Sequence, residues 1–190
     1  MRQSRLAIAF AALATLIGTL VGTTSVVSAE VVEIETLVIS GVVDGPLSGG
    51  VPKAIEVTAV TDIADLSAFG VGSATNGEGT DGEEFTFPAD ALAAGESVCV
   101  ASESPGFEEF FGFAPQYTSG AANNNGDDAI ELFHNGAVVD VYGDQDVLGD
   151  GEVWDYTDGW AKRGGGSAST AFNAADWTFS GADALDGAAT

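Results

Sequence analysis

Cysteine, histidine and basic side chains are all scarce in this chain of 190 residues. Cys99 is the only cysteine, so no disulfide can form within the chain and the fold must rest on its hydrophobic core. His134 is the only histidine, which leaves a zinc-type site without its usual nitrogen and sulfur ligands. Five Lys and Arg stand against 29 Asp and Glu, for a formal net charge of −24. We expect no direct binding to nucleic acid, because that binding relies on basic side chains at the phosphates.

The first 29 residues have the pattern of an export signal. Arg2 and Arg5 precede an apolar run over residues 6–21, and Ala29 ends a small-residue cleavage site. An uncleaved membrane anchor is the alternative, but polar residues interrupt the run, which is shorter than the roughly 20 residues of a spanning helix. We expect cleavage after Ala29. Residues 30–190 would then form one secreted or periplasmic domain with no attachment to the membrane.

Short apolar runs rich in β-branched residues follow the signal, and no heptad or long helical period is present. Gly, Asp, Asn and Pro separate these runs, a pattern typical of an all-β domain. The strands that we expect cover residues 35–43, 53–60, 85–89, 97–102, 129–133 and 137–143, with weaker candidates at 69–75 and 176–181.

Three local patterns add detail. Asn135 and Gly136 between two strand-like runs predict a hairpin with a type I′ turn, with His134 exposed beside it. Phe107, Phe110 and Phe111 have the spacing of one helical turn, which would pack all three rings on the sandwich. Cys99, in an apolar strand-like run, is expected to be a small buried hydrophobe.

Several segments together resemble the lamin-tail domain, in the branch found in secreted bacterial proteins. The matching stretches are residues 37–45, 52–57, 65–73, 85–101, 125–133 and 137–143, followed by a similar tail over 154–163 and 172–181. The chain departs from the family pattern at Gly41, Ala54 and Phe69, where local packing would differ. The resemblance implies an immunoglobulin-like β-sandwich. In that branch the domain is often the N-terminal, non-catalytic module of large extracellular nucleases and phosphatase-like proteins.

Two groups of oxygen-bearing side chains predict cation sites. One comprises Asn123, Asn125, Asp127 and Asp128, and the other comprises Asp144, Asp146, Asp150 and Glu152. Calcium takes six to eight oxygen ligands from flexible loops, and Gly149 and Gly151 allow the second loop to bend. The spacing is not that of an EF-hand. Solvated acidic turns are the alternative in so acidic a chain.

The functional prediction is a secreted, non-catalytic binding or structural module with a protein or cell-surface partner. A metal-dependent nuclease would need several metal ligands and a base for the phosphoryl charge, and these are missing from the pattern. The competing hypothesis is an accessory or truncated relative of an extracellular nuclease or phosphatase, active only with a separate catalytic domain. Trp154, Trp160 and Trp177 are expected to cover the ends of the sandwich, with an aromatic carbohydrate platform as the alternative.

Overall fold

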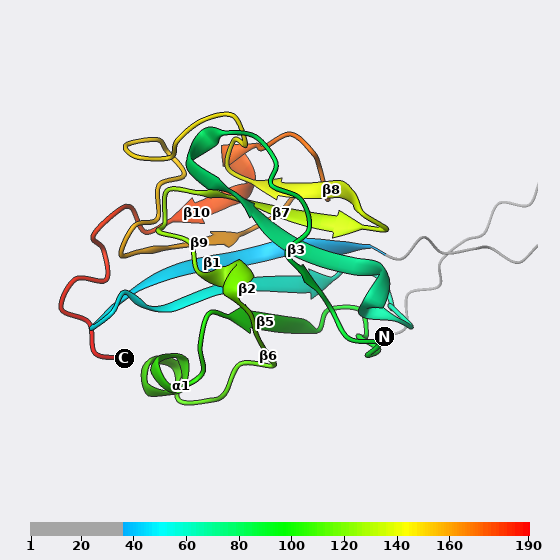
Figure 1. The fold of residues 1–190 in the computed structure, drawn as a ribbon, viewed down its shortest axis with the longest axis horizontal. Coiled ribbons are helices and arrows are strands. Elements are labelled where there is room, and N and C mark those ends of the chain that lie inside the picture. The colour runs from blue at the N-terminus through cyan, green and yellow to red at the C-terminus, as the bar shows by residue number, and fades with distance from the viewer. Residues whose placement is uncertain (1–35) are drawn as a thin grey trace, which may run out of the picture. The chain divides into compact units, whose positions relative to one another are not determined.

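The computed structural model describes residues 36–190, so the predicted export signal and its cleavage site lie outside the described residues. Within this range the chain forms ten strands, one α-helix and four short 3-10 turns. The strands make two sheets (Figure 1). No helix of the described part is both long and apolar enough to cross a membrane.

The larger sheet has six strands in the order β10-β9-β1-β2-β5-β6. Their bounds are β1 Leu37–Leu47, β2 Val51–Ala59, β5 Ser97–Ala101, β6 Tyr117–Thr118, β9 Trp160–Arg163 and β10 Trp177–Phe179. The long β1–β2 hairpin is its centre, and all neighbours are antiparallel except β5 and β6. The C-terminal strands β9 and β10 therefore complete the sheet on the free side of β1.

The smaller sheet has four antiparallel strands in the order β4-β3-β7-β8. Their bounds are β3 Phe69–Ala74, β4 Phe85–Thr86, β7 Ala129–His134 and β8 Ala137–Tyr142. The helix α1, Pro105–Phe111, lies between β5 and β6 in the chain, and the 3-10 turns are η1 Leu66–Ala68, η2 Thr75–Gly77, η3 Gly120–Ala122 and η4 Ala174–Asp176.

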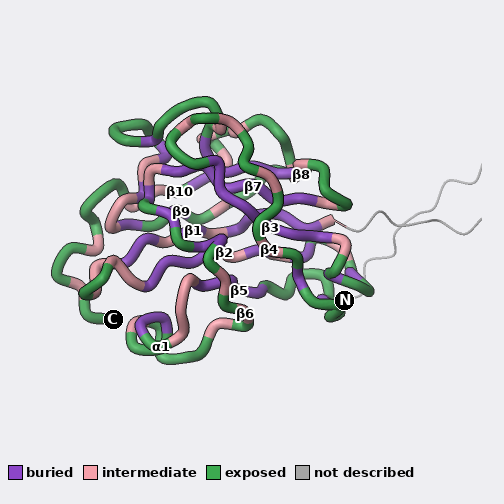
Figure 2. Tube along the Cα trace, viewed as in Figure 1, coloured by how far each residue is buried: buried purple, intermediate pink, exposed green. Residues whose placement is uncertain are grey.

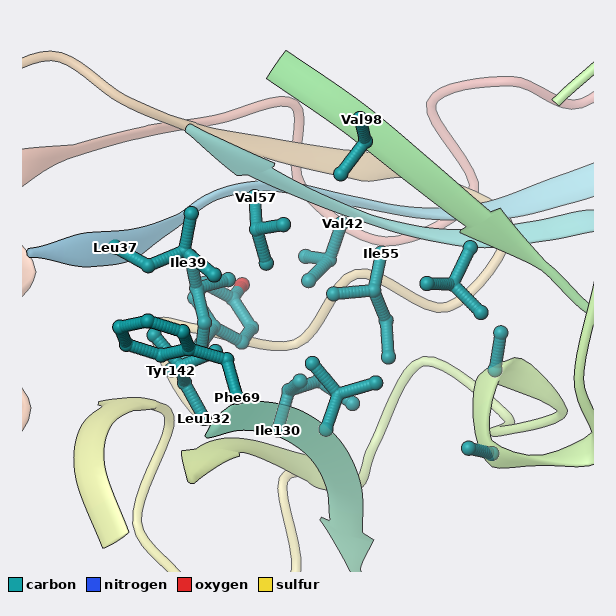
Figure 3. Close-up of a cluster of buried hydrophobic side chains, with 14 of the residues drawn as sticks. Leu37, Ile39, Val42, Ile55, Val57, Phe69, Val98, Ile130, Leu132 and Tyr142 are labelled. Atoms are coloured by element: carbon teal, nitrogen blue, oxygen red, sulfur yellow. The ribbon is translucent and has the colours of Figure 1, made fainter. Parts of the chain in front are cut away.

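The two sheets bury one continuous hydrophobic core between them. Figure 3 shows side chains of the larger sheet, such as Ile39 and Ile55, pointing towards Phe69, Ile130 and Leu132 of the smaller one. Alternation along each strand produces this face, because successive side chains of a strand point to opposite sides. Buried residues accordingly follow the strands, whereas most loops are exposed (Figure 2). The prediction of an all-β sandwich is confirmed at this level.

The β7–β8 hairpin has the predicted turn. Asn135 and Gly136 have φ values of 51° and 75°, the left-handed backbone that a type I′ turn requires at both positions. His134 is half-buried and not exposed as predicted, because its ring stacks on that of Phe69 with centroids 4.4 Å apart. The prediction missed this cross-strand pair, since His134 and Phe69 are far apart in the sequence and adjacent only in the β3–β7 register.

A bulge in β1 connects the two sheets. The register with β2 shifts between Ile39 and Gly41, and the Ile39 N–H donates to the Oδ2 atom of Asp140 at 2.9 Å. Asp140 belongs to β8 of the smaller sheet, and Arg163 of β9 donates from Nη2 to the same oxygen at 2.7 Å. Arg163 also lies over the ring of Trp177, 4.7 Å from its centroid. One buried ion pair thus ties together strands from both sheets.

The helix α1 packs on the outer face of the larger sheet, away from the main core. Phe107 is buried there with Ala54 of β2 and Ala101 of β5. Gly112 ends the helix with a φ of 79°. The helical turn is confirmed, but the prediction that all three rings pack on the sandwich is wrong for Phe111, which is 40% exposed. A helix of seven residues offers only one side to the sheet, so Phe111 faces outward while Phe110 is half-buried.

Candidate functional site

The predicted acidic loops lie side by side beyond the ends of β7 and β8. The Gly149 N–H donates to the carbonyl oxygen of Asp127 at 2.8 Å, which joins the two loops. Asp128 is buried, and its Oδ1 atom accepts the N–H of Asn76 at 2.8 Å. Burial raises the pKa of the half-buried Asp127, and the negative charge of Asp128 raises it further. Asp128 therefore acts as a structural link between loops.

The remaining predicted ligands point to open solvent. Asp144, Asp146 and Glu152 are exposed and line a depression of about 600 Å³. Asp150 is exposed as well, and Asp144 accepts the N–H of Asp146 at 3.0 Å. Among residues 36–190, no three of the six predicted carboxylates bring oxygens within 4.8 Å of one another. Calcium binding at these loops stays a prediction.

A carboxylate cluster that the sequence did not indicate forms near the C-terminus. Asp158, Asp183 and Asp186 place ligand oxygens within 4.8 Å of one another, the only such group of three in the described part of the chain. The tail is held there by backbone bonds from the Asp183 N–H to Thr157 and from the Leu185 N–H to Asp158, at 2.8 and 2.9 Å. Asp183 and Asp186 are exposed. The sequence did not predict the cluster, because Asp183 and Asp186 are far from Asp158 in the chain.

Glu131 is the most deeply buried carboxyl of the smaller sheet's outer face. It is 0% exposed, and the loop that contains Thr80 covers it. Thr80 donates to its Oε2 atom at 2.9 Å and Gln145 donates to its Oε1 atom. Burial raises the pKa of Glu131, and the two donors oppose that rise. Because both oxygens are occupied and covered, Glu131 holds two loops together.

An apolar groove lies on the outer face of the larger sheet. We call it the aromatic groove: its volume is about 500 Å³, and its aromatic lining consists of Phe107, Phe110, Phe111, Phe113 and Trp160. The small side chains at Gly41 and Ala54 leave room for it on the sheet surface. Leu185 and Thr190 of the tail complete the lining. Figure 1 shows the C-terminus next to α1.

Three large rings of this groove are in contact with solvent. Phe113 is 53% exposed, Phe111 is 40% exposed and Trp160 is 37% exposed. The phenylalanine rings pack against one another. The ring centroid of Phe107 lies 4.6 Å from that of Phe111 and 5.4 Å from that of Phe113. The groove is therefore a preformed aromatic surface with a buried anchor at Phe107.

Two charged residues and the lone cysteine also line the groove. Glu56 lies on β2 and Lys162 on β9, and they form no ion pair with each other. Burial raises the pKa of Cys99 to about 12, with a smaller contribution from the charge of Glu56. The thiol consequently stays protonated at neutral pH, in line with the predicted inert role, although Cys99 is half-buried and not fully covered.

The tryptophans divide between core and groove. Trp154 and Trp177 are 3% and 8% exposed and belong to the main core, whereas Trp160 faces the groove. All three were expected to cover the ends of the sandwich. The three rings therefore do not form one exposed platform of the carbohydrate-binding type. Comparisons with known proteins found no matching family model, no matching curated protein and no matching solved structure.

Proposed function

We propose that this chain is a secreted, non-catalytic binding module that contacts its partner through the aromatic groove. The observation that carries the proposal is the exposure of Phe111, Phe113 and Trp160 around one apolar concavity. Contiguous apolar surface on a soluble protein marks interaction sites, and concave aromatic surfaces are typical of binding pockets. Aromatic anchors also supply most of the binding energy in many interfaces.

We also propose that the β-sandwich is lamin-tail-like and of the immunoglobulin type. Its support is that the resembling segments coincide with strands in the expected order. Residues 37–45 lie on β1 and 52–57 on β2, while 125–133 lead into β7 and 137–143 cover β8. The export pattern of residues 1–29 supports secretion.

Substitution of exposed groove residues tests the proposal. Nile red, a neutral dye whose fluorescence rises in apolar surroundings, serves as the probe for processed protein. We expect saturable dye binding that Phe113→Ser and Trp160→Ser each weaken severalfold, because both remove apolar surface from the groove. Since both residues are partly exposed, the melting temperature should change little.

Val60→Ser is the matched control, because Val60 is 54% exposed but does not line the groove. It should leave dye binding unchanged. Equal loss in all three variants, or dye binding that none of them alters, would contradict the proposal.

A further inference from the structure

The charge of the surface restricts what the aromatic groove can accept. From Thr36 onward the chain has only three Lys and Arg: Lys53, Lys162 and Arg163. Lys53 pairs with Asp44 at 2.6 Å and Arg163 with Asp140 at 2.7 Å, and both basic side chains are less than 10% exposed. Lys162 is thus the one exposed base among residues 36–190. Apart from Lys162, which lines the groove, the exposed charges of residues 36–190 are all carboxylates. A surface of this charge attracts cations and repels anions.

Glu56 places a carboxylate in the groove itself. Its Oε1 atom accepts the hydroxyl of Ser40 at 2.7 Å, and no residue of the described part donates to its Oε2 atom. On β2, β5 and α1 the neighbouring lining is apolar, with Ala54, Cys99 and Phe107. Lys162 lies two strands away, across Gly41 of β1. In surroundings of low polarity a carboxylate oxygen binds an ammonium or guanidinium group more strongly than it does in open water.

The sides of the groove add to this preference. Glu108 and Glu109 are exposed on α1, and Asp186 is exposed one residue beyond Leu185, which lines the groove. The exposed rings of Phe111, Phe113 and Trp160 offer faces on which a Lys or Arg side chain can lie. The groove and its rim therefore favour apolar and cationic groups that lie close together in one ligand.

We propose that the aromatic groove binds a short segment of a partner protein in which a large apolar side chain is flanked by Lys or Arg. This proposal rests on the proposed function and adds the chemistry of the partner. A second copy of the chain is disfavoured, because two molecules that each carry a formal charge of −24 repel each other. The apolar anchor fills the groove beside Phe107, and a basic neighbour pairs with Glu56.

Three synthetic peptides test the proposal, with the tryptophan fluorescence of the protein, to which Trp160 contributes, as the signal. The first peptide has Phe-Leu between two pairs of Lys, the second replaces each Lys by Glu, and the third replaces Phe-Leu by Ser-Ser. None contains Trp, so the signal comes from the protein. We expect saturable binding of the first peptide and binding at least about tenfold weaker for the other two, since each lacks one of the two interactions.

Variants of the protein locate the interaction. Glu56→Gln keeps an oxygen for Ser40 and should weaken the first peptide severalfold, whereas Lys162→Gln should strengthen it. Glu78→Gln is the matched control, because Glu78 is exposed in the loop after β3 and does not line the groove. Its effect should stay within about twofold, as expected for one distant surface charge in salt.

The outcomes separate this inference from the proposed function. Equal binding of the Lys and Glu peptides, with loss of both in Phe113→Ser, would keep the groove as a binding site but overturn the basic partner. Binding of the Ser-Ser peptide as tight as that of the first would show attraction by surface charge alone and overturn the inference. Dimers of the free protein in sedimentation, dispersed by Phe113→Ser, would also overturn it in favour of a second copy.

Discussion

Asp140 accepts hydrogen bonds from three different segments while it is itself 0% exposed. Its donors are the N–H of Ile39 on β1, Nη2 of Arg163 on β9 and the N–H of Ser169 in the following loop. Burial raises the pKa of Asp140, and the Ser169 N–H and the Arg163 charge oppose that rise. The ionised carboxylate is stabilised only as long as all these partners are in place, so this residue couples the two sheets.

Replacing Asp140 should therefore destabilise the fold strongly. We expect Asp140→Ala to lower the free energy of unfolding by about 3–5 kcal/mol, because it leaves Arg163 buried without a counter-charge. Denaturant unfolding measures the change. The double variant Asp140→Ala/Arg163→Ala should lose less than the sum of the single losses, since the two residues interact directly.

Glu78→Ala is the control for that series, because Glu78 is exposed. Its effect should lie within about 0.5 kcal/mol. A loss of that small size for Asp140→Ala as well would contradict the role assigned to the ion pair.

At the scale of elements, the strands with strong β-branched runs and the hairpin turn could be predicted from the sequence. The pattern at Asn135 and Gly136 is local, because backbone conformation alone favours these residues there. The strands β6 and β9 were missed. β6 has two residues, and β9 reads as a polar Trp-Ala-Lys-Arg stretch whose strand conformation depends on pairing with β1. A local sequence pattern does not show that a segment becomes a strand by pairing with a strand distant in the chain.

The paired loops around Asp127 and Asp150 give the calcium prediction a direct test. Both are oxygen-rich and joined at Gly149, so calcium bound there would relieve the repulsion between their carboxylates. Calorimetry should show saturable heat that Asp127→Asn/Asp150→Asn removes, with sodium chloride of equal ionic strength as the blank. Heat lost instead in Asp183→Asn/Asp186→Asn would place the cation at the C-terminal cluster, and no saturable heat would reject calcium altogether.

At the scale of the molecule, the acidic composition predicts a surface that repels anions, but it does not indicate what the surface binds. The aromatic groove could not be predicted, because its residues come from β1, β2, β5, β9, α1, the loop after α1 and the tail. The spacing of Phe107 and Phe111 was interpreted as core packing, and only the placement of α1 outside the sandwich exposes one of these rings. Whether the rings of α1 are buried in the core or exposed in the groove depends on the face of the sheet on which the helix packs.

We propose that this molecule binds its protein partner through the aromatic groove and not through its acidic loops. The chain has three tryptophans, and only Trp160 lines the groove, while Trp154 lies beneath the acidic loops. In a proton–nitrogen correlation spectrum, the peptide with Phe-Leu between Lys pairs should shift the indole N–H signal of Trp160 and leave those of Trp154 and Trp177 in place. A shift of the Trp154 signal with none at Trp160 would contradict the claim.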